Sequence, residues 1–177
     1  MLAPNKNLEA GTEFAAEDEG ISAHDVTVTY RNGHTALRHA SFAIPKGTVT
    51  ALVGVNGAGK STLFRAMMGF VPVAAGEIRL LGGTVEDALK ANIVAYVPQA
   101  EEVDWAFPVL GEEVVMMGRY GRLGWIKRPG ETEHEMAMIA LAKVGMQDFT
   151  HRQISQLSGG QQQRVFLARA LVQDAQI

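Results

Sequence analysis

Alternating apolar and polar residues begin the patterned part of the chain. Apolar or aromatic side chains recur between Ala23 and Tyr30 with polar residues between them, which is typical of a half-buried strand. Residues 31–34, Arg-Asn-Gly-His, predict a hairpin turn, and residues 37–44 predict a second strand. We therefore expect a pair of antiparallel strands in this region.

A different pattern follows the two strands. Residues 48–53 are β-branched or apolar on both faces, which is typical of a central strand covered by helices on each side. A glycine-rich turn then leads into an expected helix over residues 61–69. Further strands are predicted at residues 76–81 and 93–97, with a short helix at residues 85–90 between them. This order of elements indicates an α/β fold.

The second half of the chain is predicted to be mostly helical. Helices are expected at about residues 110–119, 131–144 and 160–172, where apolar residues recur at helical spacing. We interpret residues 100–157, approximately, as a helical subdomain inserted between strands.

Composition narrows the functional classes. The 177 residues carry a formal net charge of −3, and the first twenty hold five acids and one base, so we expect residues 1–20 to form a flexible acidic tail. Residues 21–177 are almost neutral, which argues against a nucleic-acid partner. The chain has no cysteine, which excludes disulfides and cysteine-ligated zinc. We see neither a signal peptide nor an apolar run long enough to span a membrane.

A phosphate-binding motif follows the predicted strand at residues 48–53. Residues 54–62 match G-x-x-x-x-G-K-[ST] between a strand and a helix, the context in which this motif is informative. Its glycines let backbone N–H groups point at phosphate oxygens, the Lys60 ammonium can reach the β- and γ-phosphates, and the Ser61 hydroxyl can ligate Mg²⁺. The alternative is a glycine-rich turn with a solvent-facing lysine. The predicted nucleotide contacts are Gly54, Asn56, Gly57, Ala58, Gly59, Lys60, Ser61 and Thr62.

A second glycine-rich motif, Leu-Ser-Gly-Gly-Gln, occupies residues 157–161. Ser158 is placed to cap the helix that follows, and Gly159 and Gly160 leave N–H groups exposed at the positive end of that helix. Taken alone, the pattern is also that of an ordinary capped helix. Together with the phosphate loop, it predicts a second anion site made of Ser158, Gly159, Gly160 and Gln161.

With these two motifs the chain resembles the ATP-binding-cassette (ABC) ATPases over residues 21–177. The resemblance implies a P-loop NTPase with a RecA-like core, an N-terminal antiparallel β subdomain and an inserted α-helical subdomain. It also implies that two subunits enclose two ATP molecules. Residues 158–161 of one subunit would then act on the γ-phosphate that the phosphate loop of the other subunit holds.

The same resemblance assigns roles to two residues outside the glycine-rich motifs. Tyr30 is placed like the family aromatic that stacks on adenine, although an ordinary tyrosine at a strand end has the same pattern. Gln99 resembles the family glutamine that reaches Mg²⁺ and the attacking water. Lys60 and Gln99 are therefore the expected catalytic residues, and Ser61 and Gln99 the expected ligands of the magnesium ion of Mg-ATP.

A narrower resemblance concerns residues 97–109 and 117–121, which are similar to the ATPase subunits of manganese, zinc and iron importers. It implies that ATP hydrolysis drives import of a divalent metal ion. The implied partners are a second identical subunit, a membrane permease and, indirectly, a substrate-binding protein, and the implied location is the cytoplasmic face of the inner membrane, where the subunit is peripheral. Large apolar side chains here receive a permease helix, fill the helical subdomain's own core, or do both. They are Trp105, Phe107, Val109 and Trp125.

Two alternatives to the importer subunit stay open: a soluble ABC ATPase without a transport role, and a nucleotide-binding module without activity. In the family, an apolar strand ending in Asp-Glu follows the second motif's helix, and the sequence stops at Ile177 before such a pair. We therefore expect a chain that is incomplete at its C-terminus and inactive alone. No two of the five histidines stand four residues apart, so we expect no protein-bound transition metal.

Overall fold

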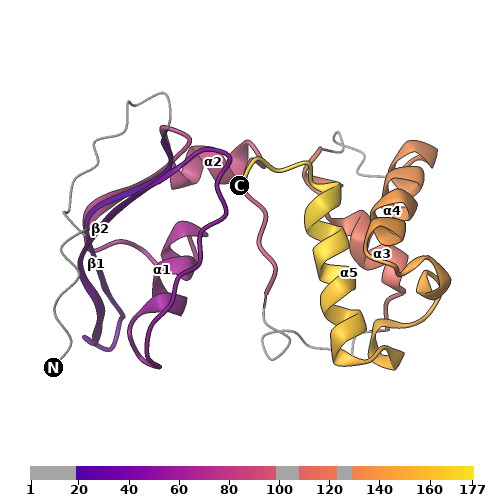
Figure 1. Ribbon diagram of the computed structural model, residues 1–177, viewed down its shortest axis with the longest axis horizontal. Helices are drawn as coiled ribbons and strands as arrows, with labels where there is room; N and C mark the ends of the chain where they lie inside the picture. Colours follow the sequence, from indigo (N-terminus) through magenta and orange to yellow (C-terminus); the bar gives the residue numbers. More distant parts are fainter. Residues whose placement is uncertain (1–18, 99–107, 123–128) are drawn as a thin grey trace, which may run out of the picture. The chain divides into compact units, whose positions relative to one another are not determined.

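The computed structural model describes residues 19–98, 108–122 and 129–177. The chain divides into two compact units, the first ending at Ala91 and the second beginning at Asn92 (Figure 1). The described residues of the first unit form the sheet and two helices, and those of the second unit form mainly helices. Within the described residues, no helix has both the length and the apolar character that crossing a bilayer requires.

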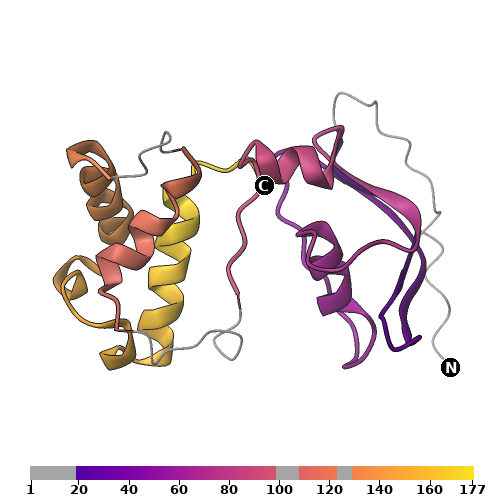
Figure 2. The ribbon, with the colours of Figure 1, turned by 180° about the vertical axis from the view of Figure 1, so that it is seen from behind.

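An antiparallel sheet forms the first unit. Its strands are β1 (Glu19–Thr29), β2 (Thr35–Pro45), β3 (Ala75–Leu80) and β4 (Gly83–Thr84), in the order β2-β1-β3-β4. The long β1 and β2 lie side by side in both ribbon views (Figures 1 and 2). The predicted hairpin and the strand near residues 76–81 are therefore confirmed.

A β-bulge explains why the apolar residues of β1 break strict alternation. Ala23 and Val26 are three positions apart, yet both are buried, because the pairing register shifts between them. Within the bulge, Asp25 has φ 51° and its neighbour on β2, His39, has φ 49°. The His39 Nδ1 and the Asp25 Oδ1 lie 2.7 Å apart on the exposed surface. The extra residue returns the following apolar side chains to the buried face.

Two helices complete the first unit. Helix α1 (Lys60–Met67) buries Thr62, Leu63 and Ala66, and α2 (Val85–Lys90) follows directly on β4. The Thr84 hydroxyl caps α2 by accepting a hydrogen bond from the Asp87 N–H at 3.1 Å. Both helices lie where the sequence predicts them.

The expected central strand at residues 48–53 is not formed. Residues 48–55 form no strand, and Val49 and Val53 are 104% and 85% exposed. The prediction is therefore wrong: the residue pattern is typical of a buried strand, but a strand also requires a neighbour for its N–H and C=O groups. Within the described residues, this segment has no such ladder.

Three helices form the core of the second unit: α3 (Gly111–Met117), α4 (Glu131–Lys143) and α5 (Gly159–Val172). All three predicted helices are present, and Figure 2 shows them packed together. Short 3₁₀ turns, η2 (Tyr120–Arg122), η3 (Gln147–Phe149) and η4 (Ile154–Gln156), link them. Their buried apolar residues are Val114, Val115, Ala137, Ala140, Leu141, Met146, Ile154, Leu157, Val165, Phe166, Ala168 and Val172.

Residues 93–97 are also not assigned as a strand, contrary to the prediction. They are nevertheless partly paired with the end of the chain. The Ile177 N–H donates to the Ile93 carbonyl at 3.0 Å, and the Ala95 N–H donates to the Ile177 carbonyl at 2.8 Å. This alternation of bonds is that of a parallel pair, so residues 93–95 and the C-terminal residues make the beginning of a parallel ladder.

Candidate functional site

The phosphate loop turns tightly from residues 48–53 into α1. Gly57 and Gly59 have φ values of 83° and 87°, in the left-handed region that residues with a Cβ rarely adopt. A Cβ added to Gly59 would also lie 2.8 Å from the carbonyl oxygen of Ala36 on β2. Backbone conformation and the close approach of β2 therefore both require glycine at position 59.

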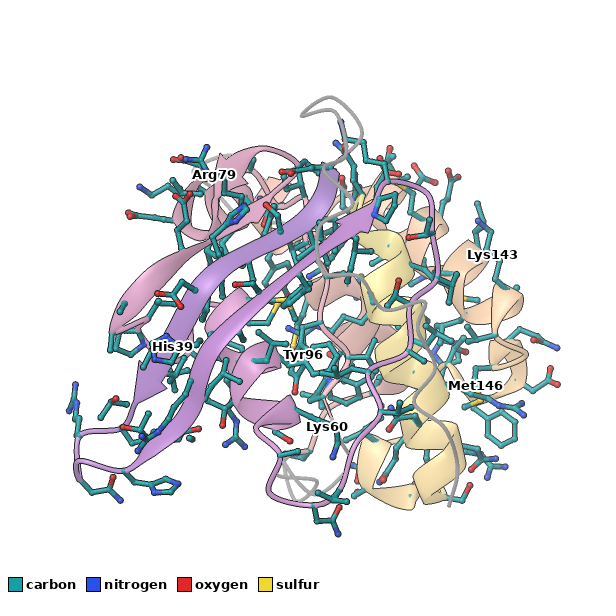
Figure 3. The ribbon with its side chains drawn as sticks, turned by 60° about the vertical axis from the view of Figure 1, so that its left-hand side comes forward. His39, Lys60, Arg79, Tyr96, Lys143 and Met146 are labelled. Carbon is teal, nitrogen blue, oxygen red and sulfur yellow. The ribbon has the colours of Figure 1, made fainter. Side chains whose placement is uncertain are left out.

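Lys60 folds back over this loop. Its Nζ donates hydrogen bonds to the carbonyl oxygens of Gly54 at 2.7 Å and Val55 at 2.8 Å. Figure 3 labels Lys60 at the loop end of α1. The N-cap of α1, Gly59, has no side chain to bond the helix N–H groups, and the first turn holds no acidic residue. The positive end of the α1 dipole and the Lys60 ammonium group thus lie at the same loop, an arrangement that favours binding of a phosphate group.

Three other predicted contacts in the phosphate loop are exposed. Asn56, Ala58 and Ser61 are exposed, so the Ser61 hydroxyl is accessible in the first turn of α1. A hydroxyl oxygen is a ligand type that Mg²⁺ accepts. The residues present therefore fit an oxygen-coordinated ion beside a phosphate group.

Tyr30 is connected to the phosphate loop through Thr62. The Tyr30 hydroxyl and the Thr62 Oγ1 lie 3.1 Å apart, although the two residues are 32 positions apart in the sequence. This hydrogen bond is the main cause that lowers the pKa of the Tyr30 phenol below its usual value; burial opposes it, and Arg65 lowers the pKa further. The sequence assigned both residues to the nucleotide but did not predict that they contact each other.

The second glycine-rich motif forms the start of α5 in the second unit. The Ser158 Oγ accepts from the Gln161 N–H at 3.4 Å, and the Gln161 side-chain oxygen accepts from the Ser158 N–H at 2.9 Å. This capping box confirms Ser158 as the N-cap. Gly159 and Gly160 are exposed, and a Cβ added to either would meet nothing within 4 Å. Packing within the described chain therefore does not explain the two glycines.

Several predicted positions lie outside the described residues. They are the expected tail up to residue 18, and Gln99, Trp105, Phe107 and Trp125. Val109 is described and packs against the apolar core of the second unit, which favours the core role for this one side chain. The phosphate loop and the motif at residues 157–161 belong to different units.

One cluster of titratable side chains is not predicted by the sequence pattern. Glu112, 9% exposed in the first turn of α3, has one carboxylate oxygen 3.3 Å from the His151 Nδ1 and the other 4.0 Å from the His134 Nε2. The spacing of histidines in the sequence does not reveal this group, because its members come from separate elements. Among the residues that the structure describes, no three such side chains are arranged to hold a metal ion.

Comparison with known families gives one match over most of the chain. The family described as "ABC transporter" matches residues 37–177. This range includes both glycine-rich motifs.

Curated relatives include ATP-binding proteins of metal transport systems. The chain is 53% identical to the chelated iron transport system membrane protein YfeB of Yersinia pestis, over 84% of the chain and 50% of YfeB. It is 49% identical to the manganese transport system ATP-binding protein MntA of Synechocystis, over 89% of the chain and 60% of the relative. It is 50% identical to the zinc transport system ATP-binding protein TroB of Treponema pallidum, over 93% and 61%. The chain thus spans between half and two thirds of the length of these relatives.

Solved structures share the fold. A nucleotide-free ATP-binding cassette from an ABC transporter superposes with a TM-score of 0.76 at 24% identity, over 89% of the chain and 66% of that structure. The ADP conformation of another cassette gives a TM-score of 0.72 at 25% identity, over the same shares. The predicted P-loop NTPase fold class is therefore confirmed.

Proposed function

This chain belongs to the ABC transporter family, and we propose that it is the ATP-binding subunit of an importer that couples ATP hydrolysis to uptake of a divalent metal ion. The observation that carries the proposal is the phosphate loop, in which Lys60 and the uncapped start of α1 face the same point. The iron, manganese and zinc transport systems named for three relatives support the class of cargo.

In the proposed reaction, Lys60 exchanges its loop carbonyls for phosphate oxygens. An ammonium donates more strongly to a charged phosphate oxygen than to a neutral carbonyl, so this exchange favours the bound nucleotide. The N–H groups at the start of α1 donate hydrogen bonds to the other phosphate oxygens. Tyr30 is the proposed contact of the adenine ring. Gly54, Asn56, Gly57, Ala58, Gly59, Ser61 and Thr62 are the other proposed contacts in the first unit.

Ser61 and Gln99 are the residues that would hold Mg²⁺, through a hydroxyl and an amide oxygen. When bound, the ion supplies positive charge to the phosphate oxygens during transfer to water. The exposed Ser61 hydroxyl supports this assignment. Gln99 is also proposed to orient the attacking water, and it lies outside the described residues.

The second motif is proposed to act on the nucleotide of a partner subunit. A Cβ at Gly159 or Gly160 would meet nothing within 4 Å. This open space supports the proposal that a molecule outside the chain, and not packing within it, requires glycine at these positions. Ser158 and Gln161 hold the start of α5 in one conformation through the capping box. A phosphate approaching this helix end would meet exposed N–H groups and the positive end of the helix dipole.

We propose a homodimer that works at the cytoplasmic face of the inner membrane with a membrane permease, and indirectly with a substrate-binding protein. The printed names of relatives, which refer to transport systems, support the permease as a partner. A peripheral position needs no membrane-spanning helix of its own, and the described part of this chain offers none.

Two measurements on the protein at its natural full length test this function. Affinity purification from detergent-solubilised membranes should recover the permease, and the complex should hydrolyse ATP in the presence of Mg²⁺. A soluble ABC ATPase would hydrolyse ATP without any permease, and a non-catalytic module would bind ATP without turnover. Either result would contradict the proposal.

A further inference from the structure

A hydrogen bond joins the end of β1 to the first turn of α1. The Tyr30 hydroxyl lies 3.1 Å from the Thr62 Oγ1, and either oxygen can donate. Tyr30 follows the last residue of β1, and Thr62 is the third residue of α1. Thr62 thus lies in the same helical turn as Lys60 and Ser61, which are proposed to act on the phosphates and the magnesium ion.

Both ends of this connection are held in place. The Tyr30 N–H donates to the His34 carbonyl at 2.9 Å, and the Tyr30 carbonyl accepts from the Gly33 N–H at 2.9 Å. The tyrosine is therefore fixed in the hairpin turn between β1 and β2. At the other end, Thr62 is only 7% exposed, so its hydroxyl has little access to water as an alternative partner.

The hairpin also approaches the start of α1 at Gly59. Gly59, the N-cap of α1, makes no side-chain hydrogen bond, and it contacts β2 through the close approach of its backbone to Ala36. The hairpin thus contacts the loop-to-helix junction by a close backbone approach at Gly59 and by a side-chain bond at Thr62. Arg65 of α1 also interacts with the Tyr30 phenol. The bond at Thr62 depends on the Tyr30 hydroxyl group.

We propose that Tyr30 is a positioning residue for the triphosphate, which acts through its hydroxyl on Thr62 and thereby on the orientation of the first turn of α1. This role is additional to stacking of the ring on a base, and it rests on the proposed nucleotide-binding function. The two roles use different parts of one side chain. They predict different responses to removal of the oxygen alone.

The experiment compares a ligand that has a base with one that has none. Calorimetry measures the affinity of the full-length protein for Mg-ATP and for magnesium tripolyphosphate. Four proteins are compared: the wild type, Tyr30→Phe, Thr62→Val and the variant that carries both changes. We expect Tyr30→Phe to lower the affinity for both ligands by a similar factor of about three to ten, which is the effect of losing one hydrogen bond. The double variant should lose less affinity than the sum of the two single losses, because both single changes remove the bond between Tyr30 and Thr62.

Controls separate this effect from changes in folding. Tyr120→Phe removes the hydroxyl of an exposed tyrosine in the second unit and should leave both affinities unchanged. Thermal unfolding of Tyr30→Phe is measured in parallel, and Tyr30→Trp, which keeps a stacking ring without the hydroxyl, gives a second test if the phenylalanine variant does not fold. A lower affinity for both ligands in a variant that folds normally supports the proposal.

Two results would overturn the inference. If Tyr30→Phe binds both ligands with wild-type affinity, the hydroxyl has no role in binding. If the affinity falls for Mg-ATP but not for magnesium tripolyphosphate, Tyr30 contacts the base alone. Lys60→Ala distinguishes these from failure of the proposed function: if wild type and Lys60→Ala are equally unable to bind ATP, the nucleotide site itself is wrong.

Discussion

The Lys60 ammonium lies 2.8 Å from the carbonyl oxygen of Val55, a residue of the same loop. A second bond, to the Gly54 carbonyl at 2.7 Å, holds the side chain over the loop. The cation therefore already lies against the loop backbone, where phosphate oxygens would be stronger acceptors than these carbonyls. Binding needs an exchange of hydrogen-bond partners there and little movement of the side chain.

Replacing Lys60 with alanine should weaken ATP binding by at least about tenfold, because a charge-assisted hydrogen bond to phosphate is lost. Titration calorimetry with full-length protein measures the change. Lys90→Ala is the matched control, since Lys90 lies on the exposed face of α2 and pairs with Glu86. Equal affinities in the wild type and Lys60→Ala would refute the phosphate-loop assignment.

Gly160→Ala should separate stability from activity. A Cβ at this position meets nothing within 4 Å, so the free energy of unfolding should be unchanged or raised by up to about 1 kcal/mol, while ATP hydrolysis falls strongly. Gly118→Ala is the contrasting change, since its Cβ would lie 2.5 Å from the Arg169 carbonyl oxygen. The free energy of unfolding of that variant, measured by chemical denaturation, should be lower by about 1–3 kcal/mol. Normal turnover by Gly160→Ala would exclude an external contact at this glycine.

The helices were predictable because their signals are local. Ser158 caps α5 and Thr84 caps α2 through residues only three positions away, and such bonds leave a mark in the sequence. The β-bulge in β1 is also visible in retrospect, since the spacing from Ala23 to Val26 does not fit a regular strand.

The features that the sequence did not predict depend on distant partners. Residues 48–53 have the composition of a buried strand, but composition does not supply the neighbouring strand that the ladder needs. The bond from Tyr30 to Thr62 joins two elements across the hairpin. The contacts of Glu112 with two histidines likewise come from separate elements, so no local spacing marks them.

The hydrogen bond to Thr62 should be visible in the ionisation of Tyr30. Because this bond lowers the pKa of the phenol, Tyr30 should titrate below pH 10, and Thr62→Val should raise its pKa again. The difference in phenolate absorbance between the wild type and Tyr30→Phe isolates this residue from the other tyrosines. The associated stabilisation is present in full only above pH 10 and is lost as the pH falls through the folded-state pKa, so it contributes nothing at neutral pH. No shift in Thr62→Val would mean that the bond is absent in solution.

The exposed apolar residues of the segment at 48–55 should make the 177-residue chain prone to self-association. Replacing Val49 and Val53 together with threonine, which keeps the β-branch, should lower light scattering at a given concentration. Ile139→Thr on α4, where the isoleucine is also exposed, is the control and should have a smaller effect. If the control lowers scattering as much, the segment is not the cause.

Uptake of radioactive metal into proteoliposomes tests the central claim most directly. The full-length subunit, reconstituted with its permease and substrate-binding protein, is supplied with Mg-ATP on the subunit's side and with manganese, zinc or iron on the other. We expect at least one of the three metals to accumulate with the wild type, and none with Lys60→Ala. Accumulation that is equal in the two, or the absence of ATP-dependent uptake of all three metals by an assembled complex that hydrolyses ATP, would contradict the account.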